Sequence, residues 1–275
     1  MRWLKAVERL RAERRPGVLV TLVAVRGHAP REAGAKMVVT ADTTWDSIGG
    51  GNVEATAVAR AREILSAGDT APATFALDLS DKAPGEHGVQ CCGGEVTVLL
   101  EPLGVRPAVA IFGVGHVGLE LARILARHDL DLHLIDSRTD QLDSEALAPL
   151  ADADARVHVH HEAVLPELVL AELPPGAHVL VMTHDHAEDA ALLDAALRSR
   201  HLGPVGLIGS SAKWTRFRST LLAGGHDPDV VDRIVTPIGL PALAGKDPAT
   251  IAVSVAAALL QSFADDGADA RRAPS

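Results

Sequence analysis

The chain has 275 residues and a formal net charge of −10, with 47% hydrophobic and 23% charged residues. This length and apolar content suffice for one large or two modest folded domains and exclude general disorder. A net acid with three Trp, four Phe and no Tyr also argues against nucleic-acid binding, because it has no overall positive field and few rings for base stacking.

The N-terminus and the cysteines suggest where the protein works. The first ten residues are charged throughout and hold no apolar core of a secretory signal. The apolar stretch between Asp247 and Asp265 is shorter than the roughly 20 residues of a membrane span. We therefore expect a cytoplasmic protein that does not enter a membrane. The two cysteines, Cys91 and Cys92, are adjacent, so they favour chemistry over a disulfide scaffold.

The first part of the chain mixes helix and strand patterns. Apolar spacing, β-branched runs and glycine-rich breaks predict a small α+β domain over residues 1–104. Its expected elements, in chain order, are a helix at 4–13, strands at 18–25, 36–40 and 45–48, a helix at 53–67, and strands at 74–79 and 95–101.

The rest of the chain alternates strand and helix, which predicts an α/β domain with a Rossmann-like, doubly wound parallel sheet over residues 105–264. Residues 265–275 are small and charged and are expected to form a flexible tail. The expected strands are 108–112, 132–136, 155–158, 178–183, 205–208 and 233–236, and the expected helices are 117–128, 163–172, 185–199, 212–223 and 248–263.

A glycine motif opens this second domain. Gly113, Gly115 and Gly118 follow an apolar strand directly and lead into a helix, and Asp136 ends the next strand, 23 residues after Gly113. The pattern is typical of dinucleotide-binding folds, in which the acid holds a ribose diol. The ligand would be NAD(P), another nucleotide or a phosphorylated cofactor, with His116 facing the same crevice. In the alternative interpretation the glycines only help packing and Asp136 caps a strand end.

Two further segments follow strands at the same predicted sheet edge. In the first, His184 is a candidate ligand contact, and His184 with His186 would hold a metal on a regular strand. The simpler interpretation is that Asp185 caps a helix, with Glu188 completing a capping box. In the second, Ser210 and Lys213 open a helix near Arg216 and Arg218, which predicts either a phosphate site or an ordinary solvated helix.

Three glycine-rich loops occur in the first domain, and together they suggest one face where a ligand approaches the backbone. They carry Arg31 and Lys36, then Gly49, Gly50 and Gly51, and finally Cys91, Cys92, Gly93 and Gly94. A thiolate held near Arg31 or Lys36 would ligate a soft metal or carry persulfide sulfur. Each loop also has a simpler interpretation as a turn, and a free cysteine is often an inert buried side chain.

Taken together, these motifs resemble the XdhC/CoxI family of xanthine dehydrogenase accessory proteins along nearly the whole chain. The resemblance is carried by Ala29-Pro30-Arg31, Gly34 to Met37, Ile48 to Gly51 with Val53-Glu54, Cys92-Gly93-Gly94, Ile111 to Gly118, Asp136-Ser137-Arg138, Thr183-His184-Asp185, Gly206 to Phe217, Pro237 to Leu240, Gly245-Lys246 and Pro248 to Ala252.

The resemblance implies a maturation chaperone that binds molybdenum cofactor (a molybdopterin), assists its sulfuration and inserts it into a molybdenum hydroxylase. The implied partners are a cysteine desulfurase and the molybdenum-binding subunit of xanthine dehydrogenase or a related hydroxylase. In this family the cysteine before the glycine pair is linked to cofactor binding, which corresponds to Cys92 here as metal ligand and reactive thiol, with Cys91 beside it.

Two other functions are compatible with the motifs. An NAD(P)-dependent oxidoreductase would use the glycine motif and Asp136, with His116 or His184 as proton donor. A docking scaffold would bind the hydroxylase subunit independently of both cysteines. Whatever the function, the Ala-rich helix expected at 248–263 would suit a homodimer interface.

Overall fold

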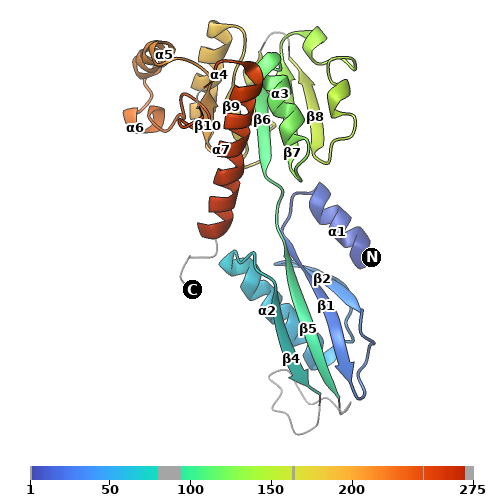
Figure 1. Ribbon diagram of the computed structural model, residues 1–275. Coiled ribbons are helices and arrows are strands. Elements are labelled where there is room, and N and C mark those ends of the chain that lie inside the picture. Colours follow the sequence, from blue (N-terminus) through green and yellow to red (C-terminus); the bar gives the residue numbers. More distant parts are fainter. Residues whose placement is uncertain (1, 80–93, 163–164, 244, 270–275) are drawn as a thin grey trace. The chain divides into compact units, whose positions relative to one another are not determined.

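The computed structural model describes residues 2–79, 94–162, 165–243 and 245–269, and it divides into two units. Unit 1 comprises the residues up to Val105 together with those after Phe263, and unit 2 comprises Arg106–Phe263. Figure 1 shows the helices and strands of both units.

Unit 1 is built on a five-stranded antiparallel sheet with the order β3-β2-β1-β5-β4. Helix α2 lies along one face of this sheet (Figure 1), and α1 packs on the other face. The bounds are α1 Trp3–Ala12, β1 Gly17–Arg26, β2 Lys36–Val39, β3 Thr44–Asp46, α2 Gly51–Ala67, β4 Ala73–Asp78 and β5 Glu95–Leu103.

The sequence explains how α2 is attached. Val53, Ala57 and Ala61 recur at every fourth position, so they share one face of the helix and are buried against the sheet. The small alanines let the helix axis approach the valines and leucines of β1 and β5 closely. The helix ends at Gly68, which takes the left-handed conformation that a C-terminal cap requires.

Unit 2 contains an entirely parallel five-stranded sheet with the order β10-β9-β6-β7-β8. In chain order within this unit that is 5-4-1-2-3, the order of a Rossmann fold, and the topology switches between β6 and β9. The strand bounds are β6 Ala108–Phe112, β7 Asp131–Asp136, β8 Arg156–His161, β9 His178–Val181 and β10 Val205–Leu207.

Both faces of this sheet are covered, as a doubly wound fold requires. Ala110 and Phe112 of β6 point into a core shared with η3, α4 and α5, whereas Val109 and Ile111 point into a core shared with α3 and α7. The expected fold class is therefore confirmed. The remaining elements are α3 His116–Leu125, η1 Thr139–Gln141, η2 Ala148–Leu150, η3 Pro166–Ala171, α4 His186–Arg198, α5 Ser211–Ala223, α6 Pro228–Val231 and α7 Pro248–Asp269.

Three expected elements differ from the structure. Residues 233–236 do not form the expected sixth strand, because only Val235 pairs with β10, through a single bridge to Gly206. Pro237 follows two residues later and has no N–H to donate to a longer ladder. The helix expected at 163–172 is the 3₁₀ helix η3, which begins at Pro166, because proline restricts the residue before it to extended backbone. The expected tail from 265 is wrong at its start, since α7 continues to Asp269.

Helix α7 also bears on the membrane question. By length and composition alone, its segment Pro248–Asp265 is apolar enough to cross a membrane, contrary to our expectation, but core helices of soluble proteins pass the same test. Ala252, Val255, Ala256 and Leu259 on one side of α7 are buried in the core of unit 2. The apolar residues on this side of α7 therefore form part of the core of unit 2.

Candidate functional site

The loops that follow β6, β7 and β9 meet at the carboxyl edge of the unit 2 sheet, at the topological switch point. Gly113 follows β6 and has a positive φ of 102°, and a Cβ atom there would overlap the backbone of Met182 and Thr183 after β9. A Cβ on Gly118 would overlap the carbonyl of Gly113. These two glycines therefore permit close approaches of backbone to backbone, as the motif predicts.

Gly115 differs from the other two glycines of the motif. A Cβ atom there would meet only Arg138 Nη2, at 3.7 Å, which is an ordinary contact. Its φ of −74° is accessible to any residue. The position faces open space at the start of α3, where a ligand would approach the helix N-terminus.

Asp136, the acid expected to bind a ribose, is 2% exposed and is engaged from within the protein. Its Oδ1 accepts from the N–H and Nε of Arg138, both at 2.9 Å, and its Oδ2 accepts from Val114 N at 2.7 Å and Arg138 Nη2 at 2.9 Å. Burial alone would raise the pKa of Asp136, but these hydrogen bonds outweigh it and hold the pKa below its ordinary value.

After β9 the structure confirms the expected N-cap of α4 but not the expected capping box. Asp185 is the N-cap of α4 and accepts hydrogen bonds from Ala187 N and Glu188 N. Glu188 does not complete a capping box, because the Asp185 N–H donates to Thr183 Oγ1 instead. The side chains of His184 and His186 are exposed, and in the described part of the chain no three His, Cys, Asp or Glu side chains are grouped to hold a metal ion.

Glu188 instead reaches across the edge to the loop after β7. Its Oε2 accepts a hydrogen bond of 3.2 Å from Ser137 Oγ. Burial raises the pKa of Glu188, while Ser137 and His184 oppose the shift and Asp136 and Asp189 add to it. The crevice thus contains a half-buried carboxyl group that takes up a proton more readily than a free glutamate.

The loop after β10 is the fourth at this edge, and polar side chains there are also paired within the protein. Ser210 caps α5 by accepting from Lys213 N at 3.3 Å. The ammonium of Lys213 lies 2.6 Å from Oδ2 of fully buried Asp189 and 3.0 Å from the carbonyl of Ile208. Lys213 therefore links α5 to α4, and its charge is already paired within the protein.

In unit 1 the structure brings glycine-rich loops together. A Cβ on Gly49 would lie 2.9 Å from Pro30 Cβ and 3.4 Å from Arg31 Cγ, and a Cβ on Gly94 would overlap the backbone of Arg26 and His28. The loop after β1 thus touches the loop before α2 and the residue that opens β5. An open pocket of about 560 Å³, lined by Arg26, Gly27, Ala76, Asp78, Gly94 and Glu95, lies at the same end of the sheet.

Glu54 shapes the loop before α2. Its Oε2 accepts hydrogen bonds from Ser47 Oγ, from Ile48 N at 3.2 Å and from Gly50 N at 3.0 Å. Gly49, Gly50 and Gly51 all have positive φ, and a Cβ on Gly50 would have no neighbour within 4 Å. The carboxylate therefore holds a backbone turn whose positive φ angles only glycine adopts readily, and this turn leaves open space above Gly50.

Lys36 does not lie with these loops. Its ammonium donates to Thr21 Oγ1 at 2.8 Å and lies 5.6 Å from the Trp3 ring, so it sits on the face of the sheet that α1 covers. Cys91, Cys92 and Gly93 lie outside the described residues, and Gly94 is the first described residue after them.

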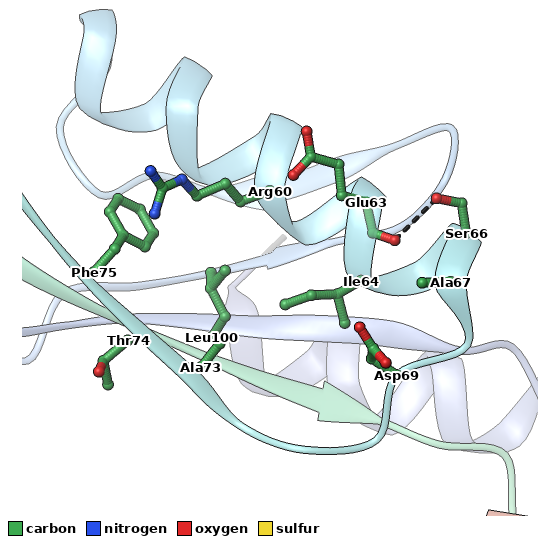
Figure 2. Close-up of a pocket in the computed structure, with 10 residues that line it drawn as sticks. All are labelled: Arg60, Glu63, Ile64, Ser66, Ala67, Asp69, Ala73, Thr74, Phe75 and Leu100. Atoms are coloured by element: carbon green, nitrogen blue, oxygen red, sulfur yellow. Dashed lines mark hydrogen bonds between the residues drawn. The ribbon is translucent and has the colours of Figure 1, made fainter. Parts of the chain in front are cut away.

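A groove of about 860 Å³ lies at the other end of α2. Figure 2 shows the Arg60 side chain extending toward the ring of Phe75 on β4, with 4.3 Å between guanidinium and ring centroid. None of the predicted site residues that the structure describes lines this groove.

Comparison with protein families shows the family to which these motifs belong. A model described as the XdhC Rossmann domain matches residues 109–259, more than half of the chain, and a model of the XdhC and CoxI family matches residues 10–76. This chain belongs to the XdhC and CoxI family. The resemblance inferred from the motifs is confirmed.

Relatives of this XdhC-family chain include two Escherichia coli K12 proteins. The molybdenum cofactor insertion chaperone PaoD is 27% identical over 87% of this chain and 81% of PaoD. The uncharacterized protein YqeB is 27% identical over 90% of this chain, which spans only 43% of YqeB. A Bacillus halodurans structure described as a xanthine dehydrogenase covers 96% of both chains at 21% identity, with a TM-score of 0.48.

Some residues that shape this XdhC-family site were missed by the sequence analysis. Arg138, Glu188 and Glu54 were visible in the motifs but received no binding role, and Asp189 lies next to Glu188. The available signal was position: Arg138 is two residues after Asp136, and Glu54 is one helical turn after Gly50. Neither position reveals which way the side chain turns.

Proposed function

We propose that this chain binds molybdenum cofactor and assists its insertion into a molybdenum hydroxylase. The observation that carries the proposal is the similarity to PaoD, a molybdenum cofactor insertion chaperone, over most of both chains. Membership of the XdhC and CoxI family supports it, since both family models match in the expected order along the chain.

The loop cluster of unit 1 fits a role in holding such a group. A Cβ atom on Gly50 would have no neighbour within 4 Å, so a pterin ring would have room to approach the backbone of this loop. Arg31, exposed beside Gly49, would meet the phosphate end. We assign the contact with molybdenum or its terminal sulfur to the Cys92 thiolate, because a soft thiolate suits both. When bound, the cofactor supplies the metal that the target enzyme requires.

The partners follow from this role. We propose that the molybdenum-binding subunit of xanthine dehydrogenase or a related hydroxylase receives the cofactor. A cysteine desulfurase would provide the terminal sulfur while this chain holds the pterin. Both encounters would take place in the cytoplasm. We also propose that the chain forms a homodimer.

The Rossmann topology of unit 2 favours one competing function, an NAD(P)-dependent oxidoreductase. The strand order and the glycine motif are those of dinucleotide-binding folds. Against this function, the acid that would bind the nicotinamide cofactor's ribose is occupied by Arg138. We therefore keep the chaperone as the proposed function.

Purification of the intact chain under anaerobic conditions from a molybdenum-replete host tests the proposal. We expect co-purified pterin, measured by fluorescence after oxidation, together with molybdenum in a matching amount. Cys92→Ala should lose most of both while retaining the wild-type circular dichroism spectrum, and Cys91→Ala should lose less. Arg123→Gln, on the exposed side of α3, is the matched control and should retain both.

Two results would contradict the proposal. One is a wild-type chain that takes up no pterin even after incubation with free cofactor. The other is a Cys92→Ala variant that retains the full amount, which would place the cofactor elsewhere. Turnover of a carbonyl substrate with NADH would instead favour the oxidoreductase.

A further inference from the structure

The end of β7 is where a dinucleotide-binding fold recognises its ligand's ribose. In such folds an acidic residue at this position accepts hydrogen bonds from the ribose diol, which requires carboxylate oxygens with free lone pairs facing the crevice. The equivalent residue here is Asp136, the last residue of β7, beside the glycine loop.

The acceptor capacity of Asp136 is already full. An ionised carboxylate has about four lone-pair sites, two on each oxygen. Each oxygen of Asp136 accepts two hydrogen bonds, one oxygen from Arg138 N and Nε and the other from Val114 N and Arg138 Nη2. With 2% of its surface exposed, Asp136 has no room for further donors.

We propose that Arg138 is a specificity-determining residue that withholds Asp136 from a ribose diol. The guanidinium binds the carboxylate through two parallel hydrogen bonds, the strongest geometry for such a pair. It also lies at the open side of the glycine loop, since its Nη2 is the nearest group to a Cβ placed on Gly115. A nucleotide in this crevice therefore gains nothing from its free 2′ and 3′ hydroxyls.

The surroundings of Arg138 do not turn this position into a site for a ribose 2′-phosphate. In related folds a nearby arginine accommodates that phosphate. Here the guanidinium is committed to Asp136, and the charges of Asp140 and Glu188 also act on it. A phosphate dianion at this position would meet these acids as well as the arginine. The role assigned to Arg138 is thus to block the diol site.

This inference goes beyond the proposed function. It concerns unit 2 and would hold or fail whether or not unit 1 binds molybdenum cofactor, because pterin retention is measured separately.

The test compares ADP with 2′-deoxy-ADP, which differ only in the diol. Isothermal titration calorimetry on the full chain should give wild-type affinities for the two nucleotides within twofold of each other. Arg138→Ala should free Asp136, so this variant should bind ADP at least tenfold more tightly than 2′-deoxy-ADP. Asp136→Asn added to Arg138→Ala should bring the ratio back below threefold.

Two controls keep the outcome clear. Arg123→Ala removes an exposed arginine that pairs with Glu120 on α3 and should behave as wild type. Arg138→Met retains the apolar stem and replaces Arg138→Ala if that variant fails to fold. A wild-type chain that prefers ADP tenfold would overturn the proposal, as would an Arg138 variant that binds both nucleotides equally or neither.

Discussion

The buried carboxylate of Asp189 joins three segments of unit 2. It is fully buried, its Oδ1 accepts from the N–H and the hydroxyl of Thr183, and its Oδ2 accepts from Lys213. The segment after β9 and the starts of α4 and α5 therefore depend on one ion pair. A charge at this depth is tolerated because its partner and its hydrogen bonds are all in place.

Lys213→Met tests this dependence at a single residue. The substitution keeps the apolar stem but leaves Asp189 buried without a cation, and breaking a buried pair in this way costs about 3–5 kcal/mol. We expect a loss of that size in the free energy of unfolding, measured with urea. Lys246→Met, at an exposed lysine, should change it by less than about 0.5 kcal/mol. Similar stabilities for the two variants would show that the pair contributes little.

Individual residues also show where prediction from sequence stops. The glycine motif predicted the roles of Gly113 and Gly118, because only glycine fits such close backbone approaches. That motif suggested Asp136 as a ribose ligand, and the segment beginning at Ser210 suggested Lys213 as a phosphate ligand, but each side chain is paired with an opposite charge. Spacing places a residue at the correct edge of the sheet, but whether its charge faces a ligand or a neighbouring side chain depends on local rotamers that the spacing does not encode.

At the scale of elements, continuous apolar patterns in the sequence predicted strands correctly, whereas patterns interrupted by proline did not predict the right element. The largely apolar runs of β6 and β9 predicted both strands correctly, because a parallel strand that is buried on both faces is typically apolar along its length. The pattern failed where proline intervened, at Pro166, the first residue of η3, and at Pro237 after the Val235 bridge. The loop cluster in unit 1 was expected to share one face, and Gly49 and Gly94 do contact the loop after β1, whereas Lys36 does not.

Strands β7 and β8 share an unusual group of imidazole rings. His133 stacks on His158 with 4.4 Å between ring centroids and 7° between ring planes, and its Nδ1 lies 3.1 Å from His160 Nε2. Since two facing ring nitrogens at this distance share one proton, the neutral forms suit the contact. Burial lowers the pKa of His160, with His158 adding to the shift and Glu172 opposing it, and Asp131 lies 3.8 Å from His158.

This cluster predicts a loss of stability in acid. Unfolded His160 takes up a proton near pH 6.5, whereas folded His160 does so only at lower pH. Between these values the unfolded state holds more protons, so the free energy of unfolding should fall as the pH decreases. Urea unfolding at pH 7.5, 6.5 and 5.5 should show a shallower fall for His160→Gln than for wild type. His116→Gln, at an exposed histidine, should match wild type, and equal slopes for all three proteins would refute the prediction.

At the scale of the whole molecule, the two units differ in the groups that they present. Unit 1 gathers glycine-rich loops at one end of an antiparallel sheet, and unit 2 presents a Rossmann edge whose charged groups are largely paired with one another. Each has its own hydrophobic core, one centred on β1 and β5 and the other on both faces of β6 and β9. Among the residues that the structure describes, those in the core of unit 2 all lie between Arg106 and Phe263.

This separation of cores predicts that unit 2 folds alone. A fragment of residues 106–269 retains every strand of the parallel sheet and the whole of α7. We expect it to unfold in urea in one cooperative transition, with a slope of about 1–3 kcal/mol per molar. Lys213→Met should shift the midpoint of the fragment to lower urea, as in the full chain, because all contacts of that ion pair lie within the fragment. A fragment without a cooperative transition, or one insensitive to Lys213→Met, would show that unit 2 depends on the rest of the chain.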